Sequence, residues 1–168
     1  MKVLFVCSEA TPFSKTGGLA DVAGALPKAL SALGHEVTVV TPFYRSVKQP
    51  GIRTLGRGLA LRFPFGQVAY SLREAQLEKG HRVVFVDQPA FFDRAGLYQE
   101  GEADYPDNHR RFGFFAVAAL SAAEVLDFTP DVVHLNDWQT GLTAVALRRG
   151  FRGRQLARAR SVFTIHNL

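Results

Sequence analysis

Cysteine is almost absent from this sequence of 168 residues, in which Cys7 is the only one. A single thiol can form neither an internal disulfide nor a thiolate cluster for a metal ion. Cys7 also ends an apolar run, a position that favours a small buried side chain over a nucleophile. The sequence therefore excludes a small domain stabilised by disulfides.

Long hydrophobic runs are absent as well. The first apolar run, from Val3 to Cys7, is too short for the core of a signal peptide. No later run approaches the roughly 20 residues of a membrane span. The composition, 47% hydrophobic and 21% charged, is that of a globular domain. We expect residues 1–168 to form one cytoplasmic domain that does not contact a membrane.

Acidic residues are too few to balance the basic ones, and the formal net charge is +5. The excess is concentrated in one segment, which contains Arg148, Arg149, Arg152, Arg154, Arg158 and Arg160. Phe151 is the only aromatic residue among them, whereas single-stranded nucleic acids are usually bound with aromatic residues between the basic ones. The pattern favours a solvated basic face, and we expect no nucleic-acid partner.

Several familiar motifs are missing. The G-x-G-x-x-G dinucleotide fingerprint, the Walker phosphate loop and the G-x-S-x-G elbow of hydrolases do not occur. No metal site is expected, because the histidines are widely spaced: His35, His81, His109, His134 and His166. A nicotinamide-dependent oxidoreductase remains an alternative only through analogy of fold.

The first third of the sequence predicts a strand, a helix and a second strand. Val3–Cys7 has the uniformly apolar character of a strand that is covered on both faces. Helical spacing of apolar residues runs from Leu19 to Leu33, with Gly34 as the C-terminal cap and a kink expected at Pro27. The segment "HEVTVVTPF", residues 35–43, is rich in β-branched residues and predicts a second buried strand.

The remainder predicts a hairpin, two helices and more strands. Apolar and polar residues alternate around Gly66 and Gly80, as in hairpins or edge strands, and a strong strand ends at Asp87. Further along the chain, helical spacing and apolar runs predict, in order, a helix at 107–126, a buried strand at 132–136, a helix at 137–149 and a buried strand at 161–168. The sequence thus predicts an α/β fold with an open, mostly parallel sheet.

Ligand-binding groups in such a sheet gather at the carboxyl ends of the strands. The stretch Lys15–Leu19 lies at such an end and opens a helix. Helix amides, two adjacent glycines and a lysine suit a diphosphate, because the backbone can approach the anion closely. A flexible loop with a solvated lysine explains these five residues equally well.

Two other strand ends carry candidate residues. Asp137 follows the strand at 132–136, where helix capping is the simpler explanation for its carboxylate. His166 lies beside Asn167 at the end of the last strand and faces the expected cleft. His134, in contrast, lies inside an apolar run, as a core histidine does.

Four segments, in order, resemble the amino-terminal half of bacterial glycogen synthases and plant starch synthases. They are "VCSEATPFSKTGGLADVAGALPKAL" from Val6, "GHEVTVVTPFY" from Gly34, "DVVHLNDWQTGL" from Asp131 and "FTIHNL" from Phe163. The resemblance covers the whole chain. It implies a GT-B architecture, two Rossmann-like domains facing across a cleft, with residues 1–168 as the amino-terminal domain and helices on both faces of its sheet.

The resemblance also implies an activity, the retaining transfer of glucose from ADP-glucose to an α-1,4-glucan. ADP-glucose is then a substrate, and no separate cofactor or metal ion is expected. The family places an Arg and Lys pair and an acidic residue in the carboxyl-terminal domain, so we expect the sequence to be part of a longer protein and to be inactive alone. A non-catalytic module that binds glucan or nucleotide is the alternative, and the oligomeric state stays open.

Residue by residue, the resemblance places the segment Lys15, Thr16, Gly17 and Gly18 against the diphosphate and sugar of the donor. It places Asp21, Asp137 and His166 around the transferred glucose and the acceptor end, His166 orienting the sugar.

Two further positions match less securely. Glu9 is expected to help shape the acceptor side of the site. Tyr98 lies in a variable loop and carries little weight.

Overall fold

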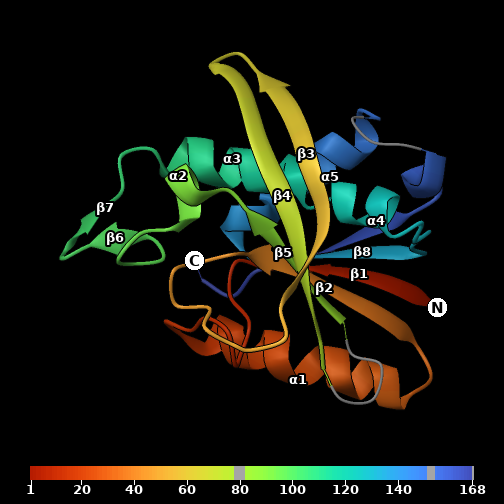
Figure 1. Ribbon diagram of the computed structural model, residues 1–168. Helices are drawn as coiled ribbons and strands as arrows, with labels where there is room; N and C mark the ends of the chain where they lie inside the picture. The colour runs from red at the N-terminus through yellow and green to blue at the C-terminus, as the bar shows by residue number, and fades with distance from the viewer. Residues whose placement is uncertain (78–81, 151–153, 168) are drawn as a thin grey trace.

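Figure 1 shows the computed structural model of the chain, which describes residues 1–77, 82–150 and 154–167. The predicted turn around Gly80, His81, and the last residue of the predicted final strand, Leu168, lie outside the described residues, as does Phe151. Within the described part of the chain, no helix is long and apolar enough to cross a bilayer.

The described strands form one central sheet and one small hairpin. The central sheet has the order β3-β4-β5-β2-β1-β8-β9. Its strands are β1 (Lys2–Val6), β2 (Glu36–Pro42), β3 (Arg53–Phe63), β4 (Gly66–Gln76), β5 (Arg82–Asp87), β8 (Val132–Asn136) and β9 (Arg160–Thr164). The run from β5 to β9 is parallel, and β3 and β4 extend it as an antiparallel hairpin. The predicted open, mostly parallel α/β sheet is confirmed.

Helices cover both faces of this sheet (Figure 1). Helix α1 (Gly18–Ala32) lies on one face, and α3 (Asn108–Ala118), α4 (Ser121–Val125) and α5 (Gly141–Arg148) lie on the other. Between β5 and α3 the chain forms the short helix α2 (Pro89–Phe92) and the hairpin of β6 (Gln99–Glu100) and β7 (Ala103–Asp104). Pro27 lies inside α1, as expected, and the kink there stays a prediction.

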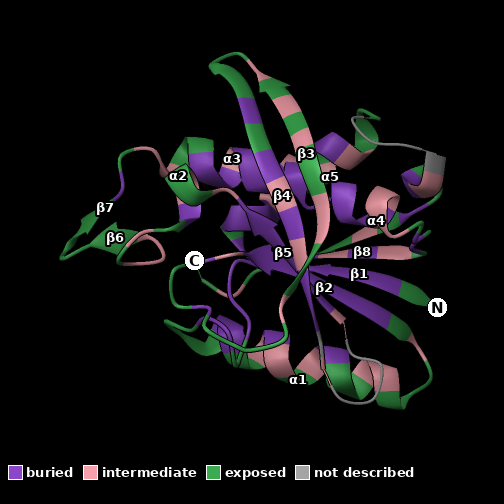
Figure 2. Cartoon of the chain, viewed as in Figure 1, coloured by how far each residue is buried: buried purple, intermediate pink, exposed green. Residues whose placement is uncertain are grey.

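The core lies between the central strands and the two helical layers (Figure 2). Leu4, Phe5 and Val6 of β1 are 0% exposed, because β2 and β8 flank this strand and helices cover it on both sides. The apolar runs of β1 and β2 therefore mark central strands, as the sequence predicted. Strand β5 also lies inside the sheet, between β4 and β2, although its run was expected in a region of hairpins or edge strands.

The last strand departs from the prediction. Strand β9 ends at Thr164, and it is not buried: Val162 is 47% exposed and Phe163 46% exposed. In the described sheet β9 occupies the edge, with β8 as its partner. An apolar run has the same pattern in a central and in an edge strand, so the sequence alone could not separate the two.

The two predicted helices also differ from those observed. Residues 107–126 form α3 and α4, separated by a turn in which Leu120 N–H bonds the Val117 carbonyl and Ser121 Oγ donates to the Ala118 carbonyl at 2.5 Å. This local hydroxyl bond competes with the regular α-helical ladder. Residues 137–149 begin as a 3₁₀ turn (Trp138–Thr140) before α5.

The predicted basic face is exposed where the structure describes it. Arg148, Arg149, Arg158 and Arg160 are all exposed. Arg152 lies outside the described residues, and the side chain of Arg154 is not described.

Candidate functional site

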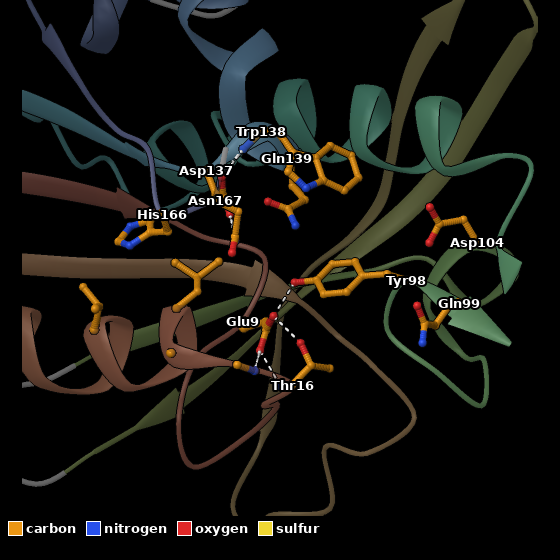
Figure 3. Close-up of a pocket in the computed structure, with 14 residues that line it drawn as sticks. Glu9, Thr16, Tyr98, Gln99, Asp104, Asp137, Trp138, Gln139, His166 and Asn167 are labelled. Carbon is orange, nitrogen blue, oxygen red and sulfur yellow. Dashed lines mark hydrogen bonds between the residues drawn. The ribbon is translucent and has the colours of Figure 1, made fainter. Parts of the chain in front are cut away.

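A cavity of about 580 Å³ opens at the carboxyl ends of the central strands. Its lining comes from four segments: Glu9 and Thr16–Leu19 with Val22; Tyr98, Gln99 and Asp104; Asp137, Trp138 and Gln139; and His166 with Asn167 (Figure 3). These segments are far apart in the sequence. Three of them meet because β1, β8 and β9 run parallel and side by side, so the loops after them leave the same edge. The Tyr98 segment comes from the connection between β5 and α3.

The cavity lies at the topological switch point of the sheet. From β1 the chain crosses to β2 on one side, and β8 pairs with β1 on the other. The loops that follow β1 and β8 therefore diverge to opposite faces and leave a crevice between them, the place where open α/β sheets bind ligands.

The start of α1 forms one wall of this cavity. Gly17 is the N-cap residue, in an extended conformation, and has no side chain with which to cap the helix. A Cβ atom built on Gly17 or Gly18 would meet nothing within 4 Å, so neither glycine is required by packing within the described chain. The first amides of a helix lack intrahelical partners and carry partial positive charge. Groups of this kind bind anions, and one of them, the Gly17 amide, already faces the carboxylate of Glu9.

Lys15 and Asp21 form an ion pair beside this wall. Lys15 Nζ lies 2.7 Å and 2.8 Å from the two carboxylate oxygens of Asp21. Both side chains are more than half exposed, and neither residue lines the cavity itself. An exposed pair of this kind contributes about 1 kcal/mol or less, so an incoming anion can compete for the lysine.

Glu9 is buried beneath the same loop, at 3% exposure. Its Oε2 accepts the Thr16 amide at 2.5 Å and the Gly17 amide at 3.4 Å, and its Oε1 accepts Thr16 Oγ1 at 2.7 Å (Figure 3). The Gly17 amide, expected to face a diphosphate, is thus directed at a carboxylate of the protein. The Glu9 carboxylate therefore fixes the loop that the sequence had assigned to the ligand.

Tyr98 completes the bonding of Glu9 from the opposite side. Its hydroxyl donates to Glu9 Oε1 at 2.7 Å and pairs with Ser8 Oγ at 2.8 Å. Burial raises the pKa of Tyr98 well above its ordinary value, so the phenol stays protonated and acts as a donor. Tyr98, a less secure match of the resemblance that was expected to carry little weight, lines the cavity. Its loop has no periodic pattern, so the residues around it added no further signal.

Asp137 follows β8 directly and has a strained backbone conformation. Its φ is 62° and its ψ 176°, a region that is almost restricted to glycine and costs roughly 1–3 kcal/mol. Its Oδ1 accepts the Trp138 amide at 3.0 Å, and its Oδ2 accepts the Asn167 side-chain amide. The capping interpretation is confirmed, but the residue also lines the cavity, so capping and a ligand contact coexist.

The two histidines of this region have different surroundings. His134 bonds Thr164 Oγ1 at 2.8 Å and forms a T-shaped contact with the buried Phe5 ring. Burial lowers the pKa of His134, and the nearby His166 lowers it further. His166 lines the cavity, and its Nε2 lies 3.1 Å from Asn136 Oδ1. His166 thus lies at the cavity, as predicted, whereas His134, expected in the core, is only half-buried.

Sequence reasoning missed Trp138 and Gln139 as cavity residues. Trp138 is 53% exposed and packs edge-on against Phe112, with ring centroids 5.2 Å apart. Gln139 is 5% exposed, and its Oε1 has no hydrogen-bond partner in the described part of the chain. Figure 3 shows its amide directed into the cavity. The motif around Asp137 was recognised, but only its carboxylate was assigned a role.

An open α/β sheet with a polar cavity at its switch point, beside the start of a helix, defines a Rossmann-like ligand-binding domain. The family described as the starch synthase catalytic domain matches residues 2–168. The chain therefore belongs to the family of starch synthase catalytic domains.

Individual relatives agree with this family. The chain is 52% identical to a glycogen synthase of Myxococcus xanthus (strain DK1622) over 170 residues, which cover all of this chain and 36% of that protein. It is 49% identical to a glycogen synthase of Anaeromyxobacter sp. (strain Fw109-5), of which it covers 35%. The chain thus spans about a third of the length of these relatives.

A solved structure supports the fold. The catalytic domain of Starch Synthase IV from Arabidopsis thaliana, bound to ADP and acarbose, superposes with a TM-score of 0.86 at 32% identity. The match covers 99% of this chain and 34% of the Arabidopsis chain.

Proposed function

We propose that this chain forms the amino-terminal Rossmann-like lobe of a cytoplasmic GT-B glycogen synthase. The complete enzyme transfers glucose from ADP-glucose to the non-reducing end of an α-1,4-glucan and retains the anomeric configuration. The observation that carries the proposal is the cavity at the switch point, because three of the family-like segments of the sequence contribute lining residues to it. The ADP and acarbose bound to the Arabidopsis relative are ligands of the same two classes.

The donor side of the proposed site is the segment Lys15–Gly18, called here the donor loop. The diphosphate of ADP-glucose lies against the start of α1, where the open space above Gly17 and Gly18 admits it. Lys15 leaves Asp21 for the diphosphate, since a doubly charged anion outcompetes one exposed carboxylate. As the bond from glucose C1 to the phosphate breaks, these groups stabilise the charge that collects on the departing ADP.

The sugar side of the proposed site lies across the cavity. Asp137 and Gln139 offer acceptor oxygens to the hydroxyl groups of the transferred glucose and of the acceptor end. Trp138 offers an apolar ring surface for a pyranose, because half of the residue is exposed. His166, fixed by Asn136, orients the sugar and takes no nucleophilic role.

A chimera tests this proposal most simply. We expect this chain, joined to the remaining two thirds of the Myxococcus xanthus relative, to transfer radiolabelled glucose from ADP-glucose to glycogen. The isolated chain should bind ADP without turnover. Lys15→Ala in the chimera should lower kcat/KM for ADP-glucose on the order of 10²-fold, because one preorganised charge-stabilising group is lost.

Three outcomes would contradict the proposal. One is a folded chimera that fails to transfer glucose while the intact relative is active. Another is a Lys15→Ala chimera with unchanged kinetics. Turnover by the isolated chain would contradict the assignment of half of the active site to a second lobe.

A further inference from the structure

Helix α3 contains a buried guanidinium that the proposed site does not use. Arg111 is 0% exposed, and it donates to the carbonyls of Phe91 at 2.7 Å and Leu97 at 2.9 Å and to Asn108 Oδ1 at 2.6 Å. None of these acceptors is charged. Burial lowers the pKa of Arg111, as expected for a cation without a directly bonded carboxylate. A buried charge of this kind is costly, and its hydrogen bonds together with three aromatic rings around the guanidinium compensate part of that cost.

The segment held by this side chain leads directly to Tyr98. Arg111 binds the carbonyl of Leu97, and Asn108 Nδ2 donates to the next carbonyl, that of Tyr98, at 2.9 Å. The Tyr105 amide also donates to the Tyr98 carbonyl, at 3.0 Å. Two side chains from one turn of α3 therefore fix two consecutive peptide units. The position of these peptide units determines where the ring of Tyr98 lies.

From Tyr98 the hydrogen bonds continue to the donor loop. The phenol binds Glu9 Oε1, and Glu9 accepts the backbone amides of Thr16 and Gly17. Each link is a direct contact; Glu9 is 3% exposed, and Tyr98 is half-buried. Buried polar networks of this kind are rigid when every member is bonded.

We propose that Arg111 and Asn108 are positioning residues for the donor loop and act through Tyr98 and Glu9. Neither residue lines the cavity. The proposal rests on the proposed function, because the donor loop is the part of the site that receives ADP-glucose. It adds that the geometry of this loop is set from α3, on the far side of the sheet from α1 (Figure 1).

The chemistry of the guanidinium explains why an arginine occupies this position. Its planar fork donates in three directions at once, here toward two carbonyls and one side-chain amide. A lysine retains the charge but presents a single nitrogen, which cannot reach three acceptors on different segments. Arg111→Lys therefore preserves charge and most of the volume while releasing at least one carbonyl.

Kinetics of the chimera described above test the proposal. We expect Arg111→Lys to lower kcat/KM for ADP-glucose roughly 10- to 100-fold, as displaced positioning groups do. The matched control is Arg110→Lys, one residue away on the exposed face of α3, where the guanidinium only lies over the Phe65 ring. That control should keep the kinetics of the parent. Asn108→Ala, at a half-buried position, serves as the second variant if Arg111→Lys does not fold.

A double-mutant cycle separates positioning from general stability. Tyr98→Phe cuts the bonds to Glu9 and Ser8 but keeps the ring in place. If Arg111 acts through Tyr98, Arg111→Lys loses most of its effect on kcat/KM in the Tyr98→Phe background. Multiplicative effects of the two substitutions would overturn the proposal.

Trp138 supplies a readout that does not depend on catalysis. It is the only tryptophan of the chain, and its ring lies 6.4 Å from that of Tyr98. In the 168-residue chain we expect Arg111→Lys to shift its emission to the red and to increase acrylamide quenching, while Arg110→Lys changes neither. Unchanged fluorescence in a folded Arg111→Lys variant would overturn the positioning role. An inactive parent chimera would instead reject the proposed function and leave this measurement valid.

Discussion

The loops after β1 and β8 each bring a buried carboxylate to the cavity, but they hold it in opposite ways. Glu9, after β1, is held by Thr16 and by Tyr98, which is 89 positions away. Asp137, after β8, accepts the amide of the next residue and has a strained backbone conformation. Glu9 therefore holds a neighbouring loop in place, whereas Asp137 is held by residues beside it and carries the backbone strain itself.

This difference predicts how each loop responds to substitution. Removing Glu9 should disturb the donor loop as a unit, since several donors lose their acceptor together. Removing Asp137 should remove one polar group from the cavity and at the same time relieve strain. The two carboxylates therefore separate loop organisation from direct ligand contact.

The largest effect is expected at Glu9. In the chimera, Glu9→Gln should lower kcat/KM for ADP-glucose on the order of 10²-fold, because an amide cannot accept from Thr16 and Tyr98 on both of its ends. It should also destabilise the domain by about 1–3 kcal/mol, the cost of an unsatisfied buried group. Urea denaturation and steady-state kinetics measure both effects. Glu100→Gln, on exposed β6, is the control. Parent-like kinetics in Glu9→Gln would contradict the assigned role.

A smaller effect on activity, with the opposite sign for stability, is expected at Asp137. Asp137→Gly should reduce kcat/KM roughly tenfold, since one hydrogen bond to a charged group is lost. Stability should stay unchanged or rise by about 1 kcal/mol, because relief of backbone strain offsets the lost cap. The matched control is Asp127→Gly, which also has a positive φ, at 50°, but is exposed and does not line the cavity. It should stabilise the domain by about 1 kcal/mol without changing activity. A strongly destabilised Asp137→Gly would show that the strain assignment is wrong.

The smallest effect concerns pH and the core beneath the β8 loop. Because burial lowers the pKa of His134 below its ordinary 6.5, the unfolded chain binds this proton more readily than the folded chain. Stability should therefore decrease as the pH falls below about 6.5, and His134→Gln should flatten that decrease. Urea midpoints between pH 5 and pH 8 provide the measurement, with the exposed His109→Gln as control. An identical pH profile in the His134→Gln variant would contradict this assignment.

Much of the fold could be predicted from the sequence because central parallel strands leave a strong local signal. The apolar runs of β1 and β8 each predict a strand from a few neighbouring residues. Gly34, which has a positive φ, marks the end of α1 in the same local way. The break at Ser121 could not be predicted, since it depends on a hydroxyl bond that competes weakly with the helix. The exposure of β9 could not be predicted either, because it depends on which strands assemble beside it.

The residues of the site also fall into those that the sequence could predict and those that it could not. The donor loop, Asp137 and His166 could be found from motifs at strand ends, where parallel topology collects them. Tyr98 and Arg111 could not, because their partners lie on segments that meet only in three dimensions. The direction of the Gly17 amide was also beyond prediction, since glycines before a helix indicate an anion but not whether that anion belongs to a ligand or to Glu9.

The central claim is that a nucleotide diphosphate binds at the start of α1, beside the donor loop. Titration of the ¹⁵N-labelled chain with ADP, followed by amide NMR, tests it most directly. The account predicts that the amide resonances of Gly17, Gly18 and Leu19 move together and saturate, and that Lys15→Ala weakens this binding. The account is contradicted if the amide resonances of the donor loop do not shift on addition of ADP while those of the basic face, Arg148–Arg160, do.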